Sequence, residues 1–115
     1  MRLLLLALAV SASLTACGGG GGDESGSKVF KSMGSLQCSG GGVSLSTLQA
    51  QLVAANVQPR SAACGTDGVA SAAVCGSPDG RIGIFEIAPT QLAAAAAAGF
   101  SPLSNLPAAK TVPCT

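Results

Sequence analysis

The sequence predicts an α+β domain in which two helices cover one face of an antiparallel sheet. Three observations support this fold class: the strand and helix patterns follow one another in the order β, α, β, β, α, β, two segments have helical character, and residues 81–87 form a strong strand pattern. Split βαβ folds of the ferredoxin-like kind have this order, with the first and third strands central and the second and fourth at the edges. We therefore expect a two-layer sandwich with a four-stranded sheet.

The first strand is expected within residues 28–38, although Gly34 blurs its boundary. The first helix is expected to begin after Ser44, because serine is a good N-cap residue and apolar residues then recur at three- and four-residue steps. Asn56 is expected to end this helix in the left-handed conformation. The apolar positions of the helix are Leu45, Leu48, Leu52 and Ala55.

Residues 57–64 are expected to form the second strand. Pro59 lies within them, and a residue without an N–H group predicts a strand at the edge of the sheet. Residues 81–87 read Arg-Ile-Gly-Ile-Phe-Glu-Ile and are expected at the centre of the sheet because nearly every position is apolar. Between these two strands, residues 69–75 fit either a short strand or an ordered loop.

The second helix is expected after Pro89, which suits the first helical position. Six alanines at 93–98 favour a helix that packs closely on the sheet, and Gly99 is expected to end it. Residues 110–114 are expected to form a short last strand, and Pro113 again predicts an edge position.

Residues 1–17 have the three-part layout of a secretory signal, with Arg2, an apolar run and small residues before Cys17. The apolar run is shorter than the roughly 20 residues that a membrane-spanning helix needs. One interpretation is a plain signal peptide with Cys17 left as a free thiol. The other follows from Leu14-Thr15-Ala16-Cys17, which resembles the lipobox of bacterial lipoproteins.

The lipobox resemblance implies that residues 1–16 are removed and that Cys17 is acylated, with palmitate-type chains that tether the protein to a membrane without spanning it. It also implies a location in the bacterial cell envelope, facing the periplasm or the cell surface. Gly18 follows the cysteine, where an aspartate is typical of retention in the inner membrane, so the outer membrane is expected. Residues 75–87 are similar to small bacterial lipoproteins, and this similarity brings no activity with it.

The chain is therefore expected to have three parts. Residues 1–16 are the signal peptide, residues 17–27 are the lipidated cysteine and a glycine-rich flexible tether, and residues 28–115 are one small domain. A domain of this size buries only about 60 to 65% of its unfolded surface, so its core needs covalent support.

Four cysteines remain when Cys17 is set aside, and an even number suits a disulfide framework. We expect Cys64 to pair with Cys75 and Cys38 with Cys114, because the fold makes these segments neighbours. If the chain near residue 69 forms its own strand, Cys38–Cys64 and Cys75–Cys114 is the alternative. Redox-active or zinc-binding roles are disfavoured, because no Cys-x-x-Cys spacing occurs and an oxidising compartment does not preserve thiolates.

The residue inventory argues against catalysis. The chain has no histidine, which excludes Ser–His and Cys–His hydrolases and removes the commonest metal ligand. A Ser–Lys pair is left open, but no lysine lies in a buried apolar segment. Asp67 and Asp79 both precede glycine in turn sequences, where aspartate usually has a structural role. We expect no catalytic residue, no metal and no cofactor.

Two further features have both a structural and a functional interpretation. Glu86 interrupts the central strand; it either faces solvent or pairs with Arg81 or Arg60, or else it is a buried functional carboxylate. Gly40–Gly42 before the first helix could cradle an anion, but the spacing and lysine of a phosphate-binding loop are missing, and a flexible connection is favoured.

Two function classes remain. The first is a lipid-anchored, non-catalytic module that binds a protein partner, with sheet-edge pairing as one route. The second is an inhibitor or accessory subunit of an envelope enzyme, which would use the loop Gly76–Gly80 beside Cys75. Nucleic acid is not an expected partner, because the net charge is only +1 and the chain has no Trp or Tyr.

Overall fold

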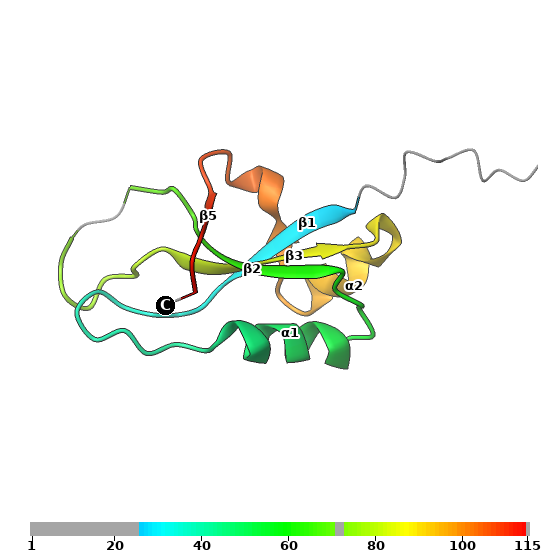
Figure 1. Cartoon of the computed structure of the whole chain (residues 1–115), viewed down its shortest axis with the longest axis horizontal. Helices are drawn as coiled ribbons and strands as arrows, with labels where there is room; N and C mark the ends of the chain where they lie inside the picture. The colour runs from blue at the N-terminus through cyan, green and yellow to red at the C-terminus, as the bar shows by residue number, and fades with distance from the viewer. Residues whose placement is uncertain (1–25, 71–72, 115) are drawn as a thin grey trace, which may run out of the picture.

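The computed structural model describes residues 26–70 and 73–114. The predicted signal peptide, the lipobox with Cys17 and nearly all of the tether lie outside the described residues. Within the described residues the chain forms an α+β domain (Figure 1). Its elements are β1 (Ser27–Ser32), α1 (Leu45–Ala54), β2 (Ser61–Thr66), β3 (Arg81–Ile87), the 3₁₀ turn η2 (Pro89–Gln91), α2 (Leu92–Ala97), β4 (Ser101–Pro102), the 3₁₀ turn η3 (Leu103–Asn105) and β5 (Lys110–Val112).

The strands form one antiparallel sheet with the order β4-β1-β3-β2-β5. β3 occupies the middle, as its apolar sequence predicts. It pairs with β1 over residues 82–87 and with β2 over residues 81–86. None of the helices among the described residues is both long enough and apolar enough to cross a membrane.

The predicted four-stranded ferredoxin-like order is not confirmed. The sheet has a fifth strand, and the last strand lies beside β2 instead of beside β1. The two-residue strand β4 takes the place beside β1, where Phe30 pairs with Ser101. The chain between β4 and β5 therefore passes from one edge of the sheet to the other.

The prediction that Pro59 lies in an edge strand was wrong. β2 begins at Ser61, so Pro59 precedes it, and β2 pairs with β3 on one side and β5 on the other. Val57, predicted as a strand residue, is buried directly after α1. The prediction of an edge position for the last strand is confirmed, since β5 ends the sheet and Pro113 follows it.

The main core lies between one face of the sheet and the two helices. Val29 on β1 lies opposite Phe85 on β3, and both side chains are fully buried. The ring of Phe85 meets the ring of Phe100 edge to face, with centroids 5.8 Å apart. The other buried members of this cluster are Leu48 and Leu52 from α1, Val57, Ile87, and Ala95 from α2.

The opposite face of β3 is buried as well. Ile82 and Ile84 point away from the helices yet are only 2% and 6% exposed. The segment between β4 and β5 runs over this side of the sheet, away from α1 (Figure 1). Gly65 of β2 leaves room for the Ile84 side chain and for the backbone of β5. A Cβ atom at this position would lie 2.5 Å from Ile84 Cδ1 and 2.7 Å from the Lys110 carbonyl oxygen. The central strand is thus covered on both faces.

The predicted ends of α1 are confirmed. Ser44 is the N-cap, and its Oγ accepts a hydrogen bond from the backbone N–H of Thr47 at 3.2 Å. Asn56 ends the helix at φ +62°, and the Val57 N–H then donates to the Leu52 carbonyl at 2.9 Å. The Leu52 carbonyl also accepts from the Ala55 N–H at 2.9 Å, so two N–H groups beyond the last turn close the helix on one carbonyl.

The second helix begins as a 3₁₀ turn at Pro89 and ends as predicted at Gly99, which has φ +93°. The Phe100 N–H closes its end by donating to the Ala95 carbonyl at 2.9 Å. Lys31 of β1 adds a cationic group there, because its Nζ donates to the Ala98 carbonyl at 3.1 Å. The same Nζ donates to Gln51 Oε1 of α1 at 2.7 Å, so Lys31 connects both helices to the sheet.

Candidate functional site

The four predicted cysteines form two disulfides, but both predicted pairings were wrong. Cys38 is bonded to Cys75, and Cys64 is bonded to Cys114. The second bond follows from the position of β5, since Cys64 lies opposite Val112 in the β2–β5 pairing. The first bond follows from a longer pairing of the chain beyond β1 and β3.

The pairing of β1 with β3 continues past the ends of both strands. The Met33 N–H donates to the Arg81 carbonyl at 3.0 Å, and residues 35–37 then run antiparallel to residues 76–79. Three hydrogen bonds hold these two segments together: Asp79 N to Ser35 O at 3.2 Å, Gln37 N to Ser77 O at 2.8 Å, and Gly76 N to Gln37 O at 3.1 Å. The extension ends at the Cys38–Cys75 disulfide.

A tight turn lies at the tip of the first segment. Leu36 and Gly40 exchange two backbone hydrogen bonds, of 2.9 and 2.8 Å, and the chain returns so that the Val43 N–H donates to the Met33 carbonyl. Cys38 lies within the turn at φ +72°, a conformation that residues with a Cβ atom rarely adopt. We call residues 33–43, 67–70 and 73–80 together the arm; it forms the left end of Figure 1.

Asp79 holds the base of the arm. Its Oδ1 accepts hydrogen bonds from Ser35 Oγ at 2.7 Å and from the Arg81 N–H at 3.0 Å. Partial burial acts to raise the pKa of Asp79, but these hydrogen bonds and the positive charge of Arg81 outweigh it, so the pKa lies below its ordinary value. The carboxylate is therefore a structural acceptor, as its turn sequence predicts.

Asp67 has a similar role where β2 passes into the arm. Its Oδ1 accepts from the Val69 N–H at 2.9 Å, and its own N–H donates to the Gly80 carbonyl at 2.9 Å. Gly80 has φ +80°, and a Cβ atom there would lie 3.0 Å from Asp67 Oδ1. Both aspartates thus shape turns, and neither is arranged for acid–base chemistry.

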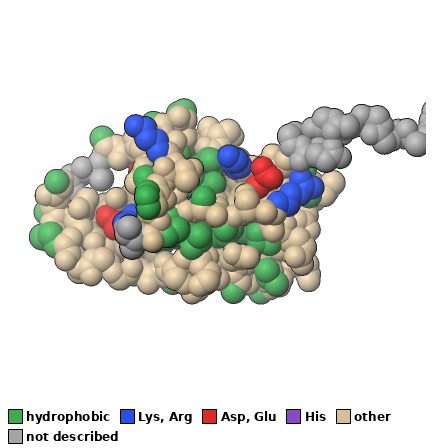
Figure 2. Space-filling model, in the orientation of Figure 1, with side chains coloured by type: hydrophobic (Ala, Val, Ile, Leu, Met, Phe, Trp, Pro, Cys, Tyr) green, Lys and Arg blue, Asp and Glu red, His purple; other side chains and the backbone are tan. Residues whose placement is uncertain are grey.

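Exposed aliphatic side chains are concentrated on the arm. Among the described residues, five large hydrophobic side chains are exposed, and four of them belong to the arm: Leu36 (38%), Val43 (39%), Val69 (58%) and Val74 (57%). The fifth is Val53 on α1. Figure 2 shows hydrophobic side chains on the surface at the left end of the molecule, where the arm lies. Sequence reasoning missed this surface, although all four residues flank predicted turns.

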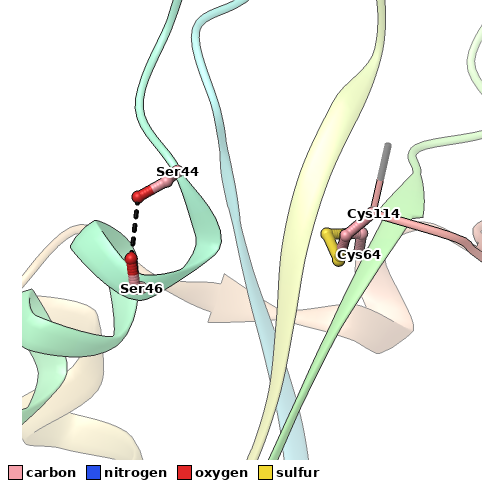
Figure 3. Close-up of a disulfide and its surroundings, with 4 residues drawn as sticks. All are labelled: Ser44, Ser46, Cys64 and Cys114. Atoms are coloured by element: carbon pink, nitrogen blue, oxygen red, sulfur yellow. Dashed lines mark hydrogen bonds between the residues drawn. A yellow bond between two sulfur atoms is a disulfide. The ribbon is translucent and has the colours of Figure 1, made fainter.

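A groove of about 480 Å³ lies at the base of the arm. Its lining includes Ser44 at the start of α1 and the Cys64–Cys114 disulfide at β2. Figure 3 shows these residues, together with Ser46, which is hydrogen-bonded to Ser44. Two polar side chains of the groove already have structural roles. The Ser44 hydroxyl caps α1, and the Asp79 carboxylate accepts hydrogen bonds from Ser35 Oγ and the Arg81 N–H. The groove therefore combines polar and apolar walls without a reactive pair of side chains.

The predicted glycine segment Gly40–Gly42 lines this groove, and all three residues have positive φ, from 64° to 76°. They form the return of the tight turn. A Cβ atom at Gly42 would lie 2.2 Å from the Met33 carbonyl oxygen, so this glycine allows the chain to pass close to β1.

Glu86 is half-buried on the sheet face that points away from the helices. It lies opposite Lys28 of β1 and Ser61 of β2. Among the alternatives for Glu86, pairing with Arg81 is disfavoured by strand geometry, because the two residues are five positions apart on β3 and alternate to opposite faces. Arg60 does lie beside it, and the Arg60 N–H donates to the Glu86 carbonyl at 2.7 Å.

No cluster of three or more potential metal-ligating side chains occurs within residues 26–70 and 73–114. No protein-family model, curated protein or solved structure matches the chain.

Proposed function

We propose that this protein is a lipid-anchored lipoprotein of the bacterial cell envelope, with the outer membrane as its favoured location. In this proposal Cys17 carries the lipid, and the membrane is the first partner of the chain. The lipobox-like sequence Leu14-Thr15-Ala16-Cys17 supports it. The two disulfides support it as well, because such bonds persist in oxidising compartments outside the cytoplasm.

We further propose that the domain is a non-catalytic protein-binding module whose contact surface is the arm. The observation that carries this proposal is the concentration of exposed aliphatic side chains on the arm, at Leu36, Val43, Val69 and Val74. Apolar side chains that a small domain leaves exposed in one region are typical of protein contacts. The disulfide and the backbone hydrogen bonds would limit the entropy that the arm loses on binding.

The partner would be a protein with a complementary apolar surface. The described arm residues carry only two charged side chains, Asp67 and Asp79, and both are engaged in its turns. None of them is aromatic, so stacking on sugar rings or nucleobases has no platform there. Aliphatic contact is the interaction that the arm supports best.

Paired variants in intact envelopes test this proposal. Leu36→Ser together with Val74→Ser removes two exposed aliphatic side chains. If these residues lie at the centre of the contact, the yield of a specific cross-linked complex should fall about tenfold or more. Val53→Ser is the matched control, because the exposed fraction of Val53 (47%) lies between those of Leu36 and Val74, and Val53 lies on α1. A complex that survives the arm changes and is lost with Val53→Ser would move the contact surface to α1 and contradict the proposal.

An inhibitor or accessory role through Gly76–Gly80 is the second candidate, and the disulfide at Cys75 favours it by rigidifying this loop. Most of the loop's N–H and carbonyl groups that face residues 35–37 are already hydrogen-bonded there. This leaves less free backbone to insert into a cleft. Changing Pro78, Asp79 and Gly80 together should abolish inhibition of a bound enzyme, whereas binding unchanged by these substitutions would exclude insertion of this loop.

We infer that the domain is an elaborated split βαβ fold. Four strands follow the order β4-β1-β3-β2, and β5 is an addition outside β2. Folds of this kind serve many functions, so this inference supplies no activity.

A further inference from the structure

The two disulfides differ in their exposure to solvent. Both cysteines of the arm disulfide, Cys38 and Cys75, are exposed. In the other disulfide Cys114 is exposed, but Cys64 lies in the interior of the sheet and is only 8% exposed. A soluble thiol can therefore approach the arm disulfide from either residue.

This difference matters for thiol–disulfide exchange, in which a thiolate attacks one sulfur and expels the other as a thiolate. In the arm disulfide, attack on Cys38 releases Cys75 as a thiolate, and attack on Cys75 releases Cys38. Both residues are exposed, so water can solvate the released thiolate in either case. Attack on Cys114 must expel Cys64, whose buried position withholds the water that would stabilise a thiolate. Attack on Cys64 itself is obstructed by its burial.

The arm is also separate from the main core. None of the eight buried residues of that core belongs to the arm. Among the partly buried hydrophobic residues packed against the core, the arm contributes Met33, which lies at its base. The Cys64–Cys114 bond lies at β2 and does not cross the arm. Opening the arm disulfide would leave the core and the other disulfide in place.

The backbone conformation of Cys38 favours a change in the conformation of the arm when the arm disulfide opens. The φ of Cys38, +72°, lies in the left-handed region, which a residue with a Cβ atom rarely adopts. The native turn is held by the Leu36–Gly40 hydrogen bonds and by the disulfide. Without the disulfide, the backbone hydrogen bonds of the turn and the Ser35–Asp79 hydrogen bond at the base of the arm would still oppose relaxation, but no covalent bond would.

The cysteine spacing disfavours a redox role, but the exposure of both arm cysteines favours one. We propose that Cys38–Cys75 is a site of thiol–disulfide exchange with dithiol reductants, and that its redox state sets the conformation of the arm. A thiolate of the dithiol attacks one arm sulfur, which forms a mixed disulfide and releases the other as a thiolate that takes a proton from water. The second thiol of the reductant then attacks the mixed disulfide and releases the second cysteine. The arm gains two electrons and two protons, and the dithiol becomes a disulfide.

The consequence for partner binding rests on the proposed function of the arm. Leu36 and Val74 lie within two residues of the disulfide, so a relaxed arm no longer presents these side chains in one fixed arrangement. Reduction should then weaken the envelope complex while the domain stays folded. The selectivity of the exchange itself does not depend on any partner.

The test is stepwise reduction of the full chain carrying Cys17→Ser, with dithiothreitol as the probe, followed by alkylation and peptide mapping. Cys38 and Cys75 should become alkylated at a dithiothreitol concentration about tenfold lower than Cys64 and Cys114. Hydrogen exchange at this intermediate stage should accelerate in peptides covering residues 73–80 and stay slow in β3. Simultaneous reduction of the two disulfides, or earlier reduction of Cys64–Cys114, would overturn the proposal.

Two double variants distinguish the arm from the rest of the domain. Cys38→Ser with Cys75→Ser should reproduce the faster exchange at 73–80 and retain slow exchange in β1 and β3, whereas global loss of protection would contradict the separation of arm and core. Cys64→Ser with Cys114→Ser leaves only the arm disulfide, which should keep its sensitivity to dithiothreitol. If reduction of the arm disulfide is selective but the yield of the cross-linked complex does not change, the result supports the exchange site and contradicts the proposal that the arm is the contact surface.

Discussion

At the scale of single residues, turn-forming side chains decide how the arm leaves the sheet. Asp79 accepts hydrogen bonds from Ser35 and Arg81, and Asp67 accepts one from Val69. These contacts use carboxylates that could otherwise be taken for catalytic groups. The Asp-Gly sequences predicted this role, but they did not reveal that Ser35, 44 positions away, would supply a hydrogen bond.

Asp79 should make the stability of the protein depend on pH in the acidic range. Its pKa is lower in the folded protein than in the unfolded chain, so its contribution is present above about pH 4 and is lost as the pH falls through the folded pKa. Urea unfolding of the wild type and of Asp79→Asn should show a stability difference at pH 7 that shrinks toward pH 2.5. A difference of equal size at both pH values would contradict this role of the charge.

At the scale of elements, one lysine joins the helices to the sheet. Lys31 donates to Gln51 of α1 and to the carbonyl of Ala98 at the end of α2, and its Nζ lies 5.2 Å from the centre of the Phe100 ring. Its partners come from two separate segments, α1 and residues 98–100 at the end of α2. The packing of both helices on β1 therefore depends in part on this side chain.

Lys31→Met keeps the apolar stem and removes both hydrogen bonds, and it should lower the free energy of unfolding by about 1 to 2 kcal/mol. Lys28→Met is the matched control on the same strand, because Lys28 is exposed, and it should change stability by less than about 0.5 kcal/mol. Equilibrium denaturation measures both. Equal effects of the two substitutions would show that Lys31 has no special structural role.

Elements with a strong local pattern could be predicted from the sequence. Residues 81–87 match β3 over its full length, and Ser44, Asn56 and Gly99 mark helix ends as expected. β4 was missed because a strand of two residues, one of them Pro102, has no periodicity to detect. The sequence predicts a start of β2 at residue 57, whereas the strand begins at Ser61. Val57 is apolar because it is buried in the core after the end of α1, and it does not belong to a strand.

The arm and its disulfide could not be predicted, for a related reason. The pairing of residues 35–37 with 76–79 lies outside the regular strands, and Gly34 at φ +73° interrupts the pattern of β1. Cysteine pairing depends on such long-range contacts. The number of disulfides follows from the cysteine count, whereas their pairing requires the fold.

At the scale of the whole molecule, two overlapping covalent loops stabilise a small core. The disulfides join residues 37 and 50 positions apart, and closing loops of this length is worth roughly 3 to 4 kcal/mol each in the chain-entropy model. One bond fastens β5 to β2, and the other fastens the arm. Under the proposed function, the arm disulfide would in addition hold the contact surface in place.

The proposed anchor makes a prediction at the same scale. Cys17→Ser should shift the protein from the membrane fraction to the soluble fraction and should block cleavage before residue 17, because no acyl chain can be attached. Fractionation and mass measurement of the mature chain test this. Membrane association that persists in this variant would contradict lipid anchoring.

The arm as contact surface is tested most directly by site-specific photo-cross-linking in intact envelopes, with the photoreactive residue placed at position 74 on the arm or at position 53 on α1. Both positions carry exposed valines in the wild type, at 57% and 47%. A discrete adduct at position 74 that is absent at position 53 is the predicted result. An adduct at position 53 with none at position 74 would contradict it.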